Sequence, residues 1–142
     1  MRFMMMIKAT PETEAARPPT EVELAAMAKY NEELVKAGVM LDGAGLQPIS
    51  KGARVTFSKG KPTVVDGPFA EAKELVAGYW LIQVKSKAEA VEWARRIPFG
   101  VDEHMGGEGV VELRQLFELE DFGESAAIDH HRKVEEALAK KG

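Results

Sequence analysis

Two segments of the chain consist almost entirely of apolar residues instead of alternating with polar ones. They span residues 3–7 and 75–84. Uninterrupted runs of this length are typical of strands buried on both faces, although periodicity alone does not distinguish them from buried helix. The first run ends just before Thr10-Pro11, which favours a strand. We predict that both runs are strands of one sheet, each covered on two sides.

Two other segments carry apolar residues at helical spacing, and a capping box precedes each of them. The sequence is Thr-Glu-Val-Glu at residues 20–23 and Ser-Lys-Ala-Glu at residues 86–89. In such a box the hydroxyl and the glutamate satisfy N–H groups at the start of a helix. We predict helices from about residue 21 to 37, closed by Gly38, and from about residue 87 to the stop at Pro98. Their apolar stripes are Leu24, Met27, Ala28, Leu34 and Val35 in the first, and Ala90, Trp93, Ala94 and Ile97 in the second.

The chain between these helices predicts a short strand followed by a hairpin. The strand begins at Val39, and Gly43 and Gly45 within it suggest a bulge or a close backbone approach. Residues 54–58 alternate polar and apolar side chains, and residues 63–65 return after a turn that contains glycine and proline.

The last third of the chain predicts one edge strand and one weak helix. Residues 111–119 alternate apolar and charged side chains, as in a half-exposed strand. After Gly123 a sparse apolar stripe predicts a C-terminal helix. Residues 11–19 and 101–109 are predicted to be loops, because they are rich in proline and glycine respectively.

Without the hairpin, the predicted order is βαββαβ, which is the ferredoxin-like order of an α+β fold. The first and third core strands lie in the middle of such a sheet, and these are the two strands that are apolar on both faces. Two helices cover only one face of a four-stranded sheet, so the other face needs a cover. We predict that a second copy of the chain supplies it, as a face-to-face homodimer.

Composition narrows the class of protein without indicating a reaction. The chain has 142 residues, no cysteine and a net charge of −4. The length fits one domain of a globular protein, and the lack of cysteine excludes disulfides, thiolate metal sites and cysteine nucleophiles. Basic residues are scattered, so nucleic-acid binding is not expected. No segment approaches the length of a membrane span, and we expect a cytoplasmic protein.

The segment Asp66-Gly67-Pro68-Phe69-Ala70-Glu71, followed by Lys73-Glu74 and Gly78, resembles the signature of the DGPF-type branch of the YCII-related proteins. The similarity covers about residues 1–119, and residues 120–142 are interpreted as a C-terminal helical extension outside it. The resemblance implies a dimeric α+β barrel of ferredoxin-like subunits. It also implies association with sigma factors of the extracytoplasmic-function class, because DGPF-type proteins are often encoded beside them.

The broader YCII-related family is thought to use a His–Asp pair, and a few members act on chlorinated aromatic rings. The first predicted helix of this chain has no histidine, and Tyr30 is the nearest candidate for its place. Ile97 stands before Pro98-Phe99, where the resemblance would place an aspartate. The pair is therefore absent, and its mechanism is not carried over.

The candidate catalytic residues are Asp66, Tyr30 and Lys73. A carboxylate held beside Gly67-Pro68 could act as an acid or base with Lys73 or Arg54 as a neighbouring cation, and the alternative is an Asx turn that only shapes the loop. The phenol of Tyr30 could reach a cleft, or it could be a core-edge aromatic with a wet tip.

Aromatic and basic side chains supply the candidate substrate-binding residues. Tyr79 and Trp80 are adjacent on a strand, so they point to opposite faces, and one of them could stack on a planar ligand. The candidate substrate-binding set is Arg54, Phe69, Tyr79 and Trp80.

No metal site or cofactor is predicted. His104 lies near glycines in a loop, and the neighbours His130 and His131 do not have the spacing of a metal-binding pair. Two functions therefore remain open: a dimeric enzyme or binder of small molecules with a cleft between sheet and partner, and a non-catalytic dimer that regulates or supports another protein.

Overall fold

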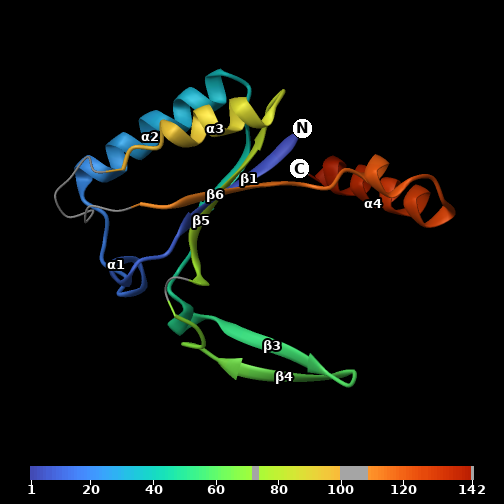
Figure 1. Cartoon of the computed structure of the whole chain (residues 1–142), viewed down its shortest axis with the longest axis horizontal. Helices are drawn as coiled ribbons and strands as arrows, with labels where there is room; N and C mark the ends of the chain where they lie inside the picture. Colours follow the sequence, from blue (N-terminus) through green and yellow to red (C-terminus); the bar gives the residue numbers. More distant parts are fainter. Residues whose placement is uncertain (72–73, 100–108, 142) are drawn as a thin grey trace.

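The computed structural model describes residues 1–71, 74–99 and 109–141, and its centre is a four-stranded antiparallel sheet (Figure 1). The strand order is β2-β5-β1-β6, so β1 and β5 lie in the middle. The prediction of an α+β ferredoxin-like fold with an inserted hairpin and a C-terminal helix is confirmed. The strands are β1 (Arg2–Lys8), β2 (Met40–Gly45), β5 (Val76–Gln83) and β6 (Val111–Gln115).

Two helices pack on one face of this sheet and form the core with it. They are α2 (Glu21–Lys36) and α3 (Lys87–Arg95), and Figure 1 shows both of them on the same side of the strands. Thr20 and Ser86 cap them, since each side-chain oxygen accepts a hydrogen bond from the backbone N–H three residues on. The buried core unites the two central strands with these helices and with the strand ends, through Phe3, Met5, Tyr30, Leu34, Val39, Trp80, Ile82, Val84, Ala90 and Ile97.

The buried stripe of α2 differs from the one that the sequence predicts. Leu34 is completely buried, but its neighbour Val35 is 63% exposed and Leu24 is also exposed. Tyr30 takes the place at the centre of the stripe and is buried. An apolar residue at the border of a helical stripe is therefore not a reliable sign of burial when a large aromatic side chain fills the same space. Gly38 ends the helix at φ 70°, as expected of a C-terminal glycine.

Among the described elements, neither the hairpin nor any helix packs on the second face of the sheet, which we call the uncovered face. It presents Met4, Met6, Tyr79 and Leu81, all half-buried, and the register pairs Met4 with Leu81 and Met6 with Tyr79. Side chains alternate across a strand, so these residues lie opposite the ones that contact α2 and α3. The face is therefore an apolar surface at the centre of the sheet.

The inserted hairpin forms a separate two-stranded sheet beyond the end of the main one (Figure 1). Its strands are β3 (Ala53–Ser58) and β4 (Lys61–Asp66), joined by Lys59 and Gly60, which both have positive φ. Two such residues form the turn whose twist matches paired strands. At its base, the N–H of Gly67 donates to the carbonyl of Gly52, and a Cβ on Gly67 would collide with the carbonyl of Ile49. Only glycine fits there.

A short helix, α1 (Pro11–Glu14), occupies part of the segment that the sequence predicts to be a loop. Thr10 caps it, and Pro11 at its first position presets the backbone angle of the first turn. The Thr-Pro pair is a helix start signal that the proline-rich composition obscures. The helix is tied to the base of the hairpin, because the N–H of Ile49 in η1 (Ile49–Lys51) donates to Glu14 Oε1 at 3.1 Å.

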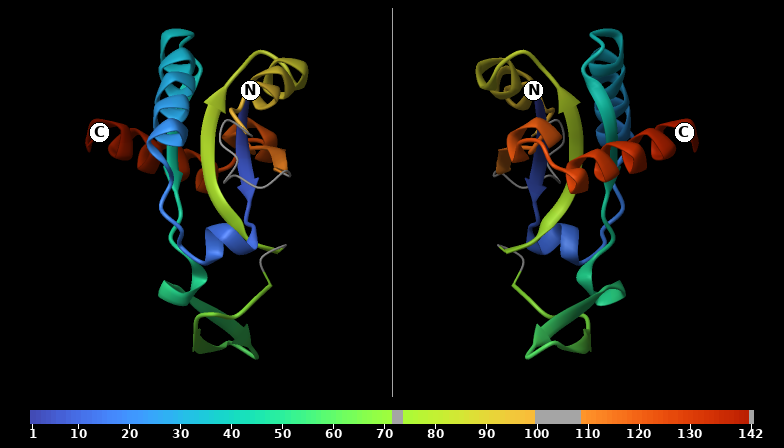
Figure 2. Two further views of the ribbon diagram at one scale, coloured as in Figure 1. Left: turned by 90° about the vertical axis from the view of Figure 1, so that its left-hand side faces the viewer. Right: turned by 90° about the vertical axis from the view of Figure 1, so that its right-hand side faces the viewer.

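The C-terminal segment leaves the sheet earlier than expected. β6 ends at Gln115, and a 3-10 helix, η4 (Leu119–Phe122), and then α4 (Ala126–Lys141) follow. Arg2 holds this departure point with a bidentate ion pair to Glu118, both bonds at 2.9 Å. The helix α4 projects on the side of the sheet away from α2 and α3, as does the hairpin (Figures 1 and 2). Among the described residues, no helix combines the length and the apolar character that crossing a bilayer requires.

The unequal burial of adjacent residues in α2 makes a matched test of the core. We expect Leu34→Ala to lower the free energy of unfolding by about 2–5 kcal/mol, because it leaves a cavity under the helix. Val35→Ala removes exposed methyl groups and should change it by less than about 0.5 kcal/mol. Urea denaturation of both variants measures the difference, and equal effects would contradict the described orientation of α2.

Candidate functional site

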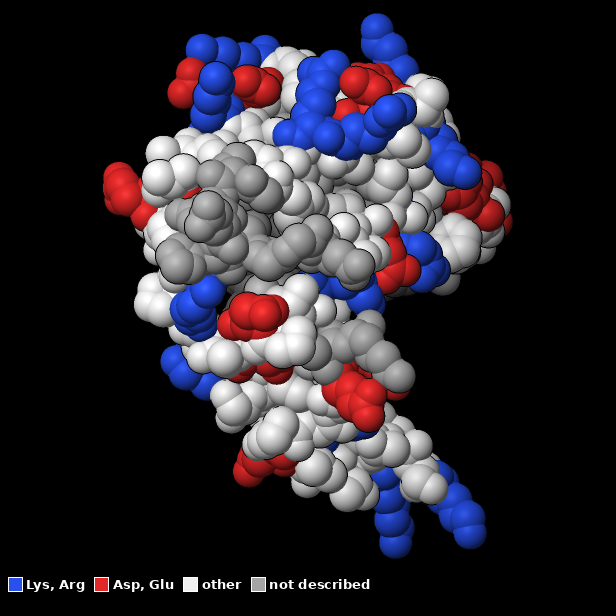
Figure 3. Space-filling model, turned by 60° about the vertical axis from the view of Figure 1, so that its left-hand side comes forward, with Lys and Arg blue, Asp and Glu red and all other residues white. Residues whose placement is uncertain are grey.

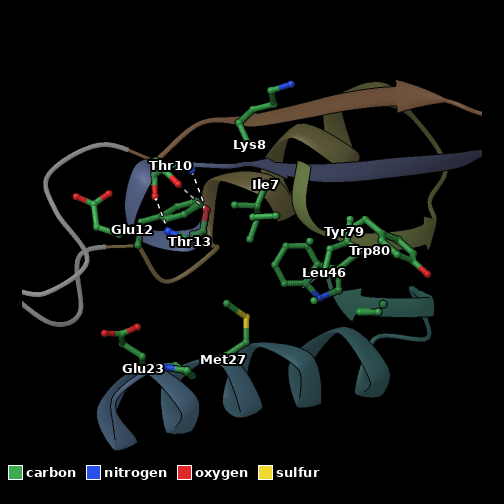
Figure 4. Close-up of a pocket in the computed structure, with 18 of the residues that line it drawn as sticks. Ile7, Lys8, Thr10, Glu12, Thr13, Glu23, Met27, Leu46, Tyr79 and Trp80 are labelled. Carbon is green, nitrogen blue, oxygen red and sulfur yellow. Dashed lines mark hydrogen bonds between the residues drawn. The ribbon is translucent and has the colours of Figure 1, made fainter. Parts of the chain in front are cut away.

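A cavity of about 680 Å³ lies between α2, α1 and the sheet at the end where β1 leaves it. Met27 of α2 and Ile7 of β1 point toward one another across it (Figure 4). Apolar side chains dominate the walls, and a few polar groups stand among them, as is typical of small-molecule sites. The apolar lining includes Ile7, Met27, Met40, Leu46, Trp80 and Phe99.

Glu23 is the most unusual polar group in this lining. Its backbone N–H donates to Thr20 Oγ1 at 3.2 Å, which is the capping bond of α2. Its side-chain Oε1 atom, however, is buried and has no hydrogen-bond partner among the described residues. A buried carboxylate oxygen without a donor is unfavourable by about 1–3 kcal/mol or more. Because Oε1 is out of the reach of water, a ligand in the cavity would bond to it only after the Glu23 carboxylate turned toward the cavity.

Asn31 places a second polar group in the wall, with a fixed orientation. Trp80 Nε1 donates to Asn31 Oδ1 at 2.8 Å. An indole N–H is only a donor, so this bond assigns the oxygen of the amide to Trp80 and leaves the amide NH₂ as the group available to the cavity. Trp80 itself lines the cavity and is buried, so its ring forms a rigid wall.

The third group of polar residues belongs to the short helix α1 and its cap, and these residues form hydrogen bonds mainly with one another. Thr10 Oγ1 accepts from the N–H of Thr13 at 3.2 Å, and Thr13 Oγ1 donates to the carbonyl of Thr10 at 2.9 Å (Figure 4). Lys8, at the edge of the cavity, pairs with Glu112 at 3.2 Å and points away from Ile7. These residues shape the rim of the cavity, and Glu23 is a further residue of its wall.

Tyr30, a candidate catalytic residue, lies in the core and not in the lining. Its hydroxyl donates to the carbonyl of Trp93 at 2.7 Å, and its ring makes edge contacts with Trp80 and Trp93 at centroid distances of 5.4 and 6.5 Å. Burial raises the pKa of the Tyr30 phenol far above its ordinary value. The phenol therefore stays neutral and holds α3 against α2.

The remaining candidates fall into two groups in space. Both Tyr79 and Trp80 are among the residues that border the cavity, although the Tyr79 side chain lies on the opposite face of β5. Asp66, Arg54 and Phe69 belong to the hairpin and its base, outside the cavity lining, and the Arg54 guanidinium lies 4.6 Å over the Phe69 ring. Asp66 is exposed. Lys73 and His104 lie outside the described residues.

Sequence reasoning missed Glu23 and Asn31 as cavity residues for a physical reason. Glu23 sits at the third position of a capping box, which already gives a glutamate a structural role. Asn31 is a polar residue beside the apolar stripe of α2, and only the indole of Trp80, about fifty positions later, fixes its orientation. The one available signal was that Glu23, Met27 and Asn31 recur every four residues along one line of the helix.

Comparison with known proteins gives three findings. A family model described as the YCII-related domain matches residues 1–120. An uncharacterised protein, R00369, of Rhizobium meliloti is 38% identical over 69 residues, which span 49% of this chain and 56% of that protein. The chain therefore spans about half the length of this curated relative.

The third finding is a solved structure. The chain resembles 5-chloro-2-hydroxyhydroquinone dehydrochlorinase (TftG) from Burkholderia phenoliruptrix AC1100, solved as a complex with 2,5-dihydroxybenzoquinone, with a TM-score of 0.45 and 16% sequence identity. The superposition covers 82% of this chain and 94% of that one.

The buried phenol predicts a pH-dependent difference between Tyr30→Phe and the native chain. At neutral pH the variant should lose about 0.5–1.5 kcal/mol, because the Trp93 carbonyl loses the Tyr30 hydroxyl and keeps only its bond from the N–H of Arg96. The pKa of Tyr30 is raised by folding, so its contribution is complete below the unfolded pKa of about 10 and is lost as the pH rises above it. The gap in unfolding free energy between the two proteins should therefore narrow from pH 8 to pH 11.

Urea denaturation across that range measures the gap. Tyr79→Phe is the matched control, because Tyr79 is only half-buried on the opposite face of β5, and the loss of its hydroxyl should cost under about 0.5 kcal/mol. A gap that is constant with pH would show that the Tyr30 phenol ionises equally well in the folded protein.

Proposed function

The chain belongs to the YCII-related family, and we propose that it is a homodimer that binds a small molecule in the cavity between α1, α2 and the sheet. The family model covers residues 1–120 and therefore all the elements that build this cavity. The single observation that carries the proposal is a cavity of about 680 Å³ with mostly apolar walls, to which Glu23 and Asn31 contribute polar residues. This cavity lies within one chain, whereas the sequence predicts a cleft between sheet and partner.

The chemistry of the lining suggests what kind of molecule would fit. The Trp80 ring, Met27 and Ile7 offer an apolar space for a ring or a short branched chain. Glu23 offers an acceptor and the Asn31 amide a donor. A compact molecule with an apolar body and an amine or hydroxyl directed at Glu23 would satisfy both the walls and the buried oxygen.

The homodimer is proposed from the uncovered face of the sheet. Met4, Met6, Tyr79 and Leu81 form an apolar surface in the middle of the sheet, on the side opposite α2 and α3. A stable dimer buries about 800 Å² on each partner, which a four-stranded sheet face can supply. A second copy placed on this face would complete the α+β barrel that the family resemblance implies.

The DGPF-type assignment and the catalytic candidates on the hairpin are part of the same proposal. Asp66 is exposed at the end of β4, and Arg54 and Phe69 stack on one another near the base of the hairpin. In one chain this group is separate from the cavity. We propose that Asp66 acts as an acid or base only where a second copy covers the base of the hairpin and removes the carboxylate from bulk water.

A second candidate function is a regulatory or accessory role through a partner protein, such as a sigma factor. The observation that favours it is α4, whose apolar stripe is open to solvent. Leu138 is 72% exposed and Val134 is also exposed, while only Ile128 of the helix is buried. An amphipathic helix of sixteen residues with an open apolar face is a common docking element.

Three probes with the same phenyl body test the cavity: 2-phenylethylamine, 2-phenylethanol and phenylacetate. The Met27 side chain points into the cavity, so each bound probe should shift its methyl signal in a spectrum of methyl-labelled protein, while Met4 on the opposite face serves as the internal control. We expect the amine to bind at least about tenfold more tightly than phenylacetate, because a charge-assisted bond to a buried carboxylate contributes about 1.5–3 kcal/mol. Phenylethanol should lie between them.

The variant Glu23→Gln should abolish the preference for the amine, whereas Glu21→Gln, an exposed residue of the same turn, should preserve it. If no probe shifts the Met27 signal, the cavity does not bind small molecules. If all three probes bind equally well to the native protein, the cavity is a binding site but Glu23 does not select the ligand.

Light scattering tests the dimer directly. At micromolar concentration the protein should have twice the chain mass of 15.6 kDa. Leu81→Glu places a charge at the centre of the uncovered face and should shift the protein toward the monomer, because burial of an unpaired charge is strongly unfavourable. A native monomer at this concentration would refute the proposed assembly.

A further inference from the structure

The β3–β4 hairpin has one face that is almost entirely apolar. The register pairs Val55 with Val64 and Phe57 with Pro62. Because directly paired residues point to the same side of a two-stranded sheet, these four side chains form one continuous surface. The opposite face is polar at every position except Val65, and its polar residues are Arg54, Thr56, Ser58, Lys61 and Thr63.

The apolar face of the hairpin is open to solvent in the single chain. Every residue of β3 and β4 is exposed, and Phe57 and Val64 are exposed by 71% and 63%. The part of the surface that belongs to the hairpin is largely uncharged, with basic side chains near its tip (Figure 3). A hairpin of two strands is marginally stable at best in water, so this one needs a contact surface to hold its structure.

The total surface of the chain points to the same need. A folded monomer of 15.6 kDa is expected to expose about 7,250 Å². This chain exposes 10305 Å². The excess is about 3,000 Å², several times the ~800 Å² that each partner of a stable dimer buries. The chain therefore has enough surface for a second interface besides the sheet face.

We propose that the apolar face of the β3–β4 hairpin packs against a second copy of this chain, so that each subunit holds the other with its hairpin. The inference rests on the homodimer proposed above and adds a second contact to the sheet face. We choose a second copy as the partner because the hairpin projects on the side of the uncovered sheet face, away from α2 and α3 (Figures 1 and 2). A copy that packs on this face would therefore lie beside the hairpin. A two-fold axis then makes the contact twice, once with the hairpin of each subunit.

This arrangement also gives Asp66 a place in the assembly. Asp66 pairs with Ala53 and lies at the base of the same face as Val55 and Val64. Packing of that face against the partner would bring the carboxylate to the edge of the subunit interface. The polar face, with Thr56 and Thr63, would remain in water.

Photo-crosslinking tests the contact even though the opposing residue is unidentified. Phe57→p-benzoylphenylalanine places the reactive group on the apolar face, and Thr56→p-benzoylphenylalanine places it one residue away on the polar face. Irradiation at micromolar concentration should yield a covalent dimer from position 57, with at least fivefold less from position 56. Equal yields, or none from position 57 in a protein that light scattering shows to be dimeric, would overturn the inference.

A matched pair of charge substitutions provides the second measurement. Val64→Asp should raise the dissociation constant of the dimer at least tenfold, and Thr63→Asp on the opposite face should change it less than threefold. Tryptophan fluorescence, from the buried Trp80 and the half-buried Trp93, reports whether each variant keeps the folded core. If Val64→Asp leaves the dissociation constant unchanged, the hairpin inference is wrong and the homodimer stands; if the native protein is monomeric, both are wrong.

Discussion

Two helices can cover only one face of a four-stranded sheet, and the rest of this structure depends on that geometrical constraint. The central strands β1 and β5 send Phe3, Met5, Trp80 and Ile82 toward α2 and α3, where they form a buried core. On their other face, Met4, Met6, Tyr79 and Leu81 are also apolar or aromatic but remain half-buried within the single chain. The sheet of one chain is therefore covered on one face and uncovered on the other. The hairpin and α4 both project on the side of the uncovered face.

The polar atoms of the aromatic cluster beneath the helices have structural roles, unlike the carboxylate of Glu23. Tyr30 and Trp80 are large, and each has one polar atom, which in both cases finds a partner in a neighbouring helix. Both donors have acceptors within the protein, so these rings are held in place and offer no free donor to a ligand. Glu23 differs, because its buried oxygen has no such partner among the described residues. The distinction between a fixed wall and an unsatisfied acceptor is what makes the cavity a candidate for recognition.

The sequence predicts most of the fold and little of the site. The element order, the central position of the two apolar strands and the caps at Thr20 and Ser86 follow from local patterns that the tertiary structure reinforces. Site residues are harder, because their roles come from contacts between distant segments. Tyr30 has the side chain of a catalytic residue but donates to a carbonyl sixty-three positions away. Glu23 has the position of a capping residue but borders a cavity.

The bond between Glu14 and the N–H of Ile49 has a consequence for how the molecule would respond to its ligand. The short helix α1 forms part of the cavity wall, and this bond ties it to η1, on which the base of the hairpin rests through Gly67. A shift of α1 on ligand binding would be transmitted to the hairpin, and a hairpin held by a partner would restrain α1 in turn. Such coupling is reciprocal by thermodynamic necessity. If ligand binding raises the association constant of the subunits by some factor, subunit association raises the affinity for the ligand by the same factor. The fraction of cavities that hold a ligand would then depend on the concentration of the protein as well as on that of the small molecule.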